Sequence, residues 1–171
     1  MLGGLTSCTL RSWRASDVPS LVRHANNRKI WLNLRDRFPH PYTPRDGRAF
    51  IRMARGMTPE SLFAIAVGDE AIGGIGFVPQ TDVERVSCEV GYWLGESFWG
   101  RGIATEALVA VTQYAIETHG FTRAFALPFA ENAGSVRVLE KAGYVLEARL
   151  KRSAIKDGQI RDQLQYAFIV P

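Results

Sequence analysis

The sequence predicts an α/β fold, in which helices flank a mixed and mostly antiparallel sheet. Three observations predict it. An apolar strand at 86–94 runs through a glycine-rich loop into a helix at 103–119. Turn sequences at 68–70 and 156–159 each separate two strand-like runs and indicate hairpins. Helical and extended segments also alternate along the chain. With 171 residues, of which 46% are hydrophobic, the chain fits one domain covering 1–171.

The first third of the chain is predicted to contain one strand and three helices. The strand covers 6–13, and Ser16 is expected to cap a helix that ends near residue 26. A second, short helix is expected at 27–34. Residues 35–44 contain three prolines and two aromatic residues, which favours an ordered loop. Thr43 and Pro44 then form the start signal of a helix at 45–55.

The rest of the chain is predicted to supply most of the sheet. Strands at 61–67 and 71–78 form a hairpin, and the strand at 86–94 follows it. One face of the helix at 103–119 is apolar and should cover the sheet, through Ile103, Ala107, Leu108, Val111 and Ala115. A strand at 121–129, a short helix and a final hairpin that ends near residue 170 complete the order.

The distribution of basic residues bears on which partners the protein can bind. The net charge is +4. Basic residues cluster at 45–55 and near the last hairpin, at Lys151, Arg152 and Lys156. Two interpretations stay open: a solvated surface, or attraction of an anionic cofactor or an acidic substrate. No arginine-rich arm or helix-turn-helix pattern is present, so no nucleic-acid partner is expected.

Cofactors and compartment follow from other absences in the sequence. Cys8 and Cys88 form no metal-like pair, so no metal is expected. The chain has no signal-like N-terminus, and no apolar run approaches the roughly 18 residues that a membrane span needs. We therefore expect a cytoplasmic protein with no membrane partner.

The loop Trp99-Gly100-Arg101-Gly102-Ile103-Ala104 is the most informative segment of the chain. Glycines before a helix let the backbone approach a ligand closely, and the unpaired N–H groups of the first turn favour phosphate. The loop lacks the lysine of a Walker sequence. It also lacks the third glycine of a dinucleotide fingerprint, because position 105 is Thr. A different phosphorylated cofactor is therefore predicted.

This loop resembles the Arg/Gln-x-x-Gly-x-Gly/Ala acetyl-CoA loop of the GNAT superfamily of N-acetyltransferases. A second signature follows at the expected separation, with Asn132, Ser135 and Gly143-Tyr144 matching Asn-x-x-Ser/Ala and Gly-Phe/Tyr. The resemblance covers about 8–170. It is closest to the Rim-type branch, which acetylates ribosomal-protein N-termini, through the Gly-Tyr-Trp-Leu strand at 91–94 and the run from 98 to 107. It implies a GNAT-like fold and acetyl transfer from acetyl-CoA to an amine.

The resemblance also implies a set of cofactor contacts. The pyrophosphate would lie against backbone N–H groups of Gly100, Arg101, Gly102, Ile103, Ala104 and Thr105. The pantetheine arm would pair with the backbone around Trp93 and Leu94, and Asn132 would also contact the cofactor. Two alternatives stay open: Arg101 as a solvated loop residue and Asn132 as a helix cap. Trp99 stands where most members have Arg or Gln, which removes one polar contact.

Three residues are candidates for the chemistry. By resemblance, Ser135 protonates the leaving thiolate, because the position of the tyrosine used by many members is Leu139 here. Glu89 is the first candidate for the base, and Asp162 is the substitute, because the Rim-type glutamate falls on Ala154. For each, a structural alternative stays open: helix capping for Ser135, and hydrogen-bond acceptance or a structural role for the carboxylates.

The acceptor amine is not fixed by these residues. Residues 35–42 and the preceding helices are expected to form one wall of the acceptor groove, with Asp36, His40 and Tyr42 as polar candidates. The resemblance implies direct attack in a ternary complex and favours a protein N-terminal α-amine. A polyamine or an amino sugar is also compatible. So are a non-catalytic CoA-binding module and a basic protein- or nucleic-acid-binding domain. Either a monomer or a homodimer is expected.

Overall fold

A computed structural model describes residues 5–170 of the chain. Residues 1–4 and 171, which belong to the predicted domain, lie outside the described part. Seven strands form one sheet in the order β1-β2-β3-β4-β5-β7-β6, with β4 and β5 the parallel pair among antiparallel neighbours. The strands are β1 (Thr9–Arg11), β2 (Leu62–Val67), β3 (Glu70–Pro79), β4 (Ser87–Leu94), β5 (Arg123–Ala126), β6 (Val145–Lys156) and β7 (Gln159–Ile169).

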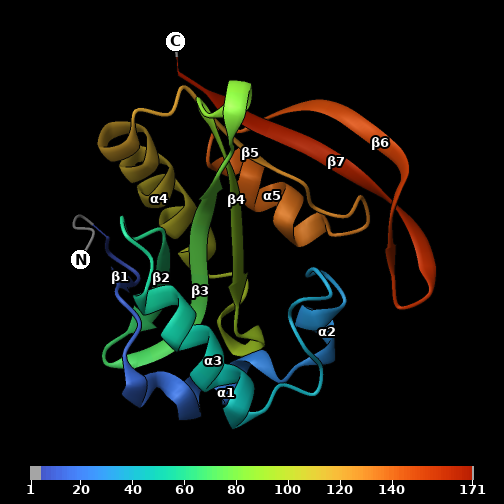
Figure 1. Ribbon diagram of the computed structural model, residues 1–171. Helices are drawn as coiled ribbons and strands as arrows, with labels where there is room; N and C mark the ends of the chain where they lie inside the picture. The colour runs from blue at the N-terminus through green and yellow to red at the C-terminus, as the bar shows by residue number, and fades with distance from the viewer. Residues whose placement is uncertain (1–4, 171) are drawn as a thin grey trace.

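Helices lie on both sides of this sheet, as Figure 1 shows. The helices are α1 (Val18–Ala25), α2 (Arg28–Trp31), α3 (Pro44–Arg55), α4 (Ile103–His119) and α5 (Ala133–Lys141). The long helix α4 covers one face with α5, whereas α1 and α3 pack together on the other. The α/β class, the mixed sheet and the order of elements are therefore confirmed. Within the described residues, no helix has the length and apolar character needed to cross a lipid bilayer.

Two hydrophobic cores result from the alternation of side chains along the strands. In β2, Phe63 and Ile65 join the core beneath α4, while Ala64 joins the core beneath α1 and α3. In β4, the even-numbered residues join the α4 core, and Trp93 packs against the other. All five apolar positions predicted on the inner face of α4 are buried. The side chains of odd- and even-numbered β4 residues therefore lie on opposite faces of the sheet.

The sheet opens between β4 and β5. The two strands pair only from Ser87 to Glu89, although β4 continues to Leu94. The Gly95 N–H donates to the Ile72 carbonyl (2.8 Å) and the Val86 carbonyl accepts from Thr122 N–H (2.9 Å). Because bonding direction alternates along a strand, the backbone groups of even-numbered β4 residues face the open side. Beyond Glu89, the even-numbered backbone groups of β4 thus have no partner strand, and we call this opening the groove beside β4.

Three predicted elements differ from the structure. The first strand is shorter than 6–13, because β1 pairs with β2 at only three positions. Ser16 does not cap α1; it lies in a 3-10 turn at Ala15–Asp17, and α1 begins at Val18. The reason is Asp17, which is buried against the Arg11 guanidinium through two bonds of 2.8 Å and so tightens this turn. The strand at 121–129 shrinks to β5, with Pro128 beyond its end.

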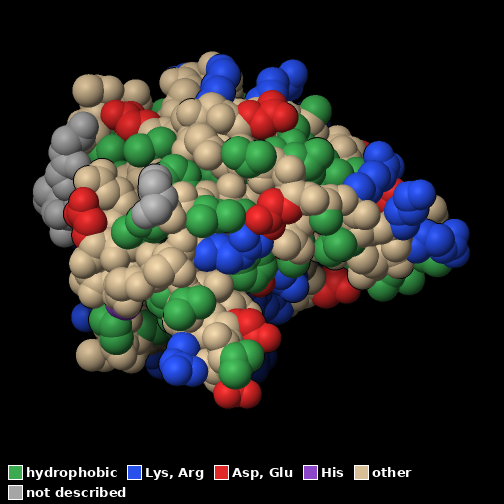
Figure 2. Space-filling model, turned by 90° about the horizontal axis from the view of Figure 1, so that it is seen from above, with side chains coloured by type: hydrophobic (Ala, Val, Ile, Leu, Met, Phe, Trp, Pro, Cys, Tyr) green, Lys and Arg blue, Asp and Glu red, His purple; other side chains and the backbone are tan. Residues whose placement is uncertain are grey.

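The other element predictions are confirmed with small shifts at their ends. Asn27 caps α2, and the Thr43 side chain caps α3 in a reciprocal arrangement with Asp46. The turn between β6 and β7 lies at Asp157-Gly158, and this end of the hairpin projects beyond the other strands of the sheet (Figure 1). Viewed from above, basic side chains gather at that end of the molecule (Figure 2).

Lys156 differs from the other basic residues of the hairpin, because it is not solvated. Its side chain is 1% exposed, and Nζ lies 2.8 Å from an Asp36 carboxylate oxygen and 3.9 Å from the centre of the Trp31 ring. Arg28 of α2 also pairs with Asp157 (2.6 Å) at the hairpin turn. The tip of the hairpin is therefore attached to α2 and the loop after it.

Candidate active site

The glycine loop begins α4 in the geometry that the sequence predicts. Gly100 and Gly102 have left-handed φ angles of +75° and +80°, and Gly102 is the N-cap of α4 without a side-chain cap. The first hydrogen bond of the helix runs from Glu106 N–H to the Gly102 carbonyl. The N–H groups before it are left for an external acceptor. A Cβ on either glycine would meet no atom within 4 Å, so this loop has room for a phosphate.

Two side chains brace the loop from within. The Trp99 indole N–H donates to the Leu94 carbonyl (2.7 Å) and so ties the loop to the end of β4. Arg101 donates to the Ser97 carbonyl (2.7 Å), and its guanidinium lies 5.3 Å from the centre of the Phe98 ring. Trp99 therefore supports the loop shape at the position where the resemblance implies Arg or Gln. Arg101 keeps its positive charge beside the loop, and its direct contact with phosphate stays a prediction.

The backbone of β4 beside this loop divides into two sets. By the alternation above, the N–H groups of Tyr92 and Leu94 face the open groove, whereas the backbone groups of Trp93 face β3. The Leu94 carbonyl is already bonded to Trp99. For strand-like pairing with a ligand, the structure thus offers Tyr92 and Leu94. A backbone contact from Trp93 stays a prediction without this support.

Ser135 lies at the start of α5 and is bonded to β4. Its hydroxyl and that of Tyr92 are 2.7 Å apart, and the Tyr92 hydroxyl also lies 3.2 Å from the Ser135 carbonyl. Burial raises the pKa of Tyr92 to about 12, an effect the bond to Ser135 partly offsets, so its phenol keeps its proton at neutral pH. The Ser135 hydroxyl is therefore not a helix cap. Asn132 is the cap, because its side-chain oxygen accepts from Ser135 N–H (3.1 Å).

Glu89 lies at the last residue of β4 that pairs with β5. Its carboxylate forms an ion pair with Arg35, from the loop predicted to border the acceptor groove. Glu89 shares the odd-numbered face of β4 with Trp93, whereas Tyr92, which holds Ser135, is on the even-numbered face. The candidate base and the candidate proton donor therefore lie on opposite faces of β4, with the open groove at its edge. A reacting group in the groove could meet a carboxylate on one side and a hydroxyl on the other.

Asp162 has a different setting. Its carboxylate accepts from the Arg152 backbone N–H (2.8 Å) and from Arg149 Nε (2.7 Å). These bonds span the register shift of β6 between Leu150 and Ala154, where Arg152 has a φ of +52°. The Arg152 N–H, followed by Arg149, lowers the pKa of Asp162. The structure thus shows a role for Asp162 in holding the bulge, and a role as base stays a prediction.

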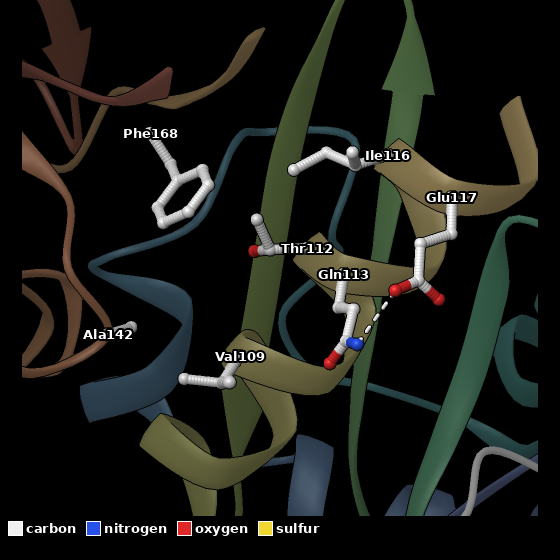
Figure 3. A pocket seen from close by; sticks show the side chains of 7 residues that line it. All are labelled: Val109, Thr112, Gln113, Ile116, Glu117, Ala142 and Phe168. Carbon is white, nitrogen blue, oxygen red and sulfur yellow. Dashed lines mark hydrogen bonds between the residues drawn. The ribbon is translucent and has the colours of Figure 1, made fainter. Parts of the chain in front are cut away.

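A pocket elsewhere on the molecule shares none of these residues. It has a volume of about 230 Å³ and lies between α4, the end of α5 and β7 (Figure 3). Its lining includes Val109, Ile116 and Phe168, and its side chains Gln113 and Glu117 are bonded to each other (2.8 Å). Within residues 5–170, no cluster of His, Cys, Asp or Glu is arranged to hold a metal ion. The groove beside β4 is therefore the candidate site.

Comparison with known proteins agrees with this geometry. Residues 8–145 match the acetyltransferase (GNAT) domain family. The chain belongs to the GNAT family of acetyltransferases. It is 27% identical over 169 residues to an uncharacterized N-acetyltransferase, p20, of Bacillus licheniformis, covering 94% of this chain and 92% of that protein. It is 29% identical over 165 residues to the [ribosomal protein uS5]-alanine N-acetyltransferase of Escherichia coli, covering 94% and 83%.

A solved structure extends the comparison to a bound ligand. Mycobacterium smegmatis RimJ in complex with CoA-disulfide superposes with a TM-score of 0.80 at 26% identity, covering 94% of this chain and 80% of that one. The resemblance to the GNAT superfamily and its Rim-type members is thus confirmed, and the protein is a GNAT N-acetyltransferase. RimJ is bound to a form of coenzyme A in that structure, and the uncapped α4 N-terminus of this chain, with its open glycines, fits the pyrophosphate of such a ligand.

Sequence reasoning missed two side chains of this GNAT site. Tyr92 lies within the Gly-Tyr-Trp-Leu strand at 91–94. Its even-numbered position in β4 was a signal that its side chain lies on the face covered by α4 and α5. Nothing in the sequence signals Arg35 as the partner of Glu89, because 54 residues separate them.

Ser135→Ala is expected to lower turnover more than affinity for acetyl-CoA. The change removes the hydroxyl but keeps the Ser135 N–H that Asn132 caps. Loss of one proton donor should reduce kcat by about 10²-fold. Tyr92→Phe should act through the same bond, so the double variant should lose little more than Ser135→Ala alone. Steady-state kinetics measures turnover, and calorimetric titration measures the affinity for acetyl-CoA. Equal losses of turnover and affinity would instead indicate a binding role.

Asp162→Asn is expected to lower thermal stability while leaving turnover nearly unchanged. The pKa of Asp162 is lower in the folded than in the unfolded chain, so its charge stabilises the fold above the unfolded value of about 3.9. That contribution is lost as pH falls through the folded-state pKa. The difference in melting temperature between wild type and variant should therefore shrink between pH 7 and pH 3. A large loss of turnover without a loss of stability would make Asp162 the base.

Proposed function

We propose that this protein acetylates a protein N-terminal α-amine, by direct attack on acetyl-CoA in a ternary complex. The observation that carries the proposal is the opening of the sheet beside β4, with Glu89 on one face and Ser135 at the other. Similarity to the E. coli uS5-alanine N-acetyltransferase, over 94% of this chain and 83% of that protein, supports the class of acceptor.

The cofactor contacts are proposed on the same basis. Backbone N–H groups from Gly100 to Thr105 hold the pyrophosphate at the positive end of α4. Leu94 and Tyr92 pair with the pantetheine arm along the unpaired edge of β4. Asn132, besides capping α5, places Ser135 toward the groove. When bound, acetyl-CoA supplies a thioester carbonyl that an amine can attack.

The chain's own residues move the protons. Glu89 takes one proton from the acceptor ammonium, and the freed nitrogen bonds to the carbonyl carbon as the carbon–sulfur bond breaks. Ser135 donates its hydroxyl proton to the departing thiolate and is reprotonated by solvent through Tyr92. The second proton of the new amide leaves to solvent. An α-amine titrates near 8, by rough reference values, so at neutral pH it needs less help from a base than a lysine does.

The test compares matched peptides. Purified protein is incubated with acetyl-CoA and a peptide that begins with alanine, or with the same peptide blocked at its N-terminus and carrying one internal lysine. Thiol release and mass spectrometry locate the acetyl group. Acetylation of the free N-terminus alone supports the proposal. Transfer only to spermidine or an amino sugar would make the protein a small-molecule acetyltransferase. Acetyl-CoA binding without transfer to any amine would leave a CoA-binding module.

A further inference from the structure

The odd-numbered face of β4 has an open position between two functional side chains. Glu89, Gly91 and Trp93 share this face. Gly91 is exposed, and a Cβ there would meet no atom within 4 Å. The Trp93 indole leans away over Gly74, where a Cβ would lie 2.8 Å from its Nε1. The surface at Gly91 is therefore bare backbone with a carboxylate at one end and an indole at the other.

A cation already occupies the carboxylate end. The guanidinium of Arg35 pairs with Glu89, and the two side chains are 56% and 26% exposed. Exposed ion pairs of this kind contribute little to stability, because water and side-chain entropy offset the attraction. A second cation can therefore replace the guanidinium without leaving Glu89 unpaired.

Two contacts hold the backbone that follows Arg35. Its neighbour Asp36 holds the buried Lys156, which also lies over the Trp31 ring. The Phe38 ring packs against Trp93 with centroids 5.7 Å apart. Because these contacts anchor the loop to the hairpin and to β4, the Arg35 side chain can swing out while the loop stays in place.

We propose that the surface at Gly91 is the subsite for the acceptor's ammonium group, and that Arg35 holds this subsite as a placeholder until the acceptor arrives. The inference rests on the proposed function and adds the position of the acceptor amine and the role of Arg35. The acceptor amine enters as its ammonium form, because a cation that replaces the guanidinium leaves the charge of Glu89 balanced. The bare backbone of Gly91 gives room for the atoms that carry the amine.

Arg35→Gln tests the placeholder through the direction of its effect. Removing a competitor for Glu89 should lower the KM for an alanyl peptide about two- to fivefold, a range set by the weakness of exposed ion pairs. The kcat and the KM for acetyl-CoA should change less than twofold, by the same rough measure. Loss of a merely structural residue would raise the acceptor KM, so the sign distinguishes the two roles.

Arg14→Gln is the matched control. Arg14 is 52% exposed and lies 3.6 Å from Asp69, at the turn between β2 and β3. The Arg14→Gln variant should leave all kinetic constants unchanged. An acceptor KM that is unchanged or higher in Arg35→Gln overturns the placeholder. Wild-type protein that acetylates no peptide would contradict the proposed function itself, and the inference would fall with it.

Gly91→Val tests the subsite separately. Valine suits a strand and its Cβ would meet no atom within 4 Å at this exposed position, so the variant should fold and bind acetyl-CoA as the wild type does. Its branched side chain should reduce transfer to the alanyl peptide at least about 100-fold by displacing the amine from Glu89. The rate of transfer by Gly91→Ala should lie between those of the wild type and Gly91→Val. Near-normal acceptor kinetics in Gly91→Val, with normal melting temperature, would overturn the subsite.

Discussion

Gly102→Glu is expected to abolish measurable acetyl-CoA binding, with a loss of affinity above about 100-fold. Two effects combine. The added carboxylate lies where the pyrophosphate should bind, and like charges repel strongly at a site that binds through N–H groups. The left-handed φ of +80° also strains any residue with a Cβ, by about 1 kcal/mol. Calorimetric titration with acetyl-CoA measures the loss.

Two variants separate charge from strain. Gly102→Ala adds the Cβ without the charge and should weaken binding only modestly. Gly120→Glu places the same carboxylate at the opposite end of α4, where φ is +70° and a Cβ is equally free of contacts. That variant should bind acetyl-CoA normally, whatever its stability. Unchanged affinity in Gly102→Glu would remove the loop from the cofactor site.

Glu89→Gln is expected to reduce acetyl transfer by about 10²- to 10⁴-fold with little change in affinity for acetyl-CoA. Glutamine has the same shape and can still accept a hydrogen bond from Arg35, but it cannot take a proton from the acceptor. The comparison is therefore between two nearly identical structures. Stopped-flow or steady-state assays with an alanyl peptide measure the change in rate.

Glu147→Gln provides the control for removing a paired surface glutamate. Glu147 pairs with Arg123, chiefly through side-chain hydrogen bonds, which lower its pKa to about 2. It lies outside the groove, so this variant should alter stability rather than turnover. Full activity in Glu89→Gln would show that a water molecule or another group removes the proton.

Local patterns predicted the elements that local forces determine. The bounds of α4 were predicted to the residue, because Gly102 and Gly120 both adopt left-handed angles that end regular helix geometry. The Thr43 cap and the turn at Asp157-Gly158 were also predicted correctly. The prediction that Ser16 caps the helix was wrong, because Asp17 forms a buried ion pair with Arg11 and lies in a 3-10 turn before α1. That pair depends on tertiary packing, which the spacing of residues does not report.

The site was predictable where it consists of backbone and unpredictable where it consists of paired side chains. The glycine loop consists of consecutive residues, so the sequence alone predicted its position. The Tyr92–Ser135 bond, the Arg35–Glu89 pair and the Lys156–Asp36 pair join residues 43, 54 and 120 positions apart. Such pairs form only after β4, α5 and the last hairpin have assembled. Their partners therefore had to be observed.

Thermal unfolding with and without acetyl-CoA tests the central claim, that the groove beside β4 holds this cosubstrate. ATP and NAD serve as phosphate-bearing controls. A ligand at about 100 times its dissociation constant adds roughly 2.7 kcal/mol of stability, and each kcal/mol moves a domain of this size by about 2–4 °C. We predict an increase of several degrees with acetyl-CoA alone, which is lost in Gly102→Glu. No increase at saturating acetyl-CoA, or an equal increase with ATP, would contradict the account.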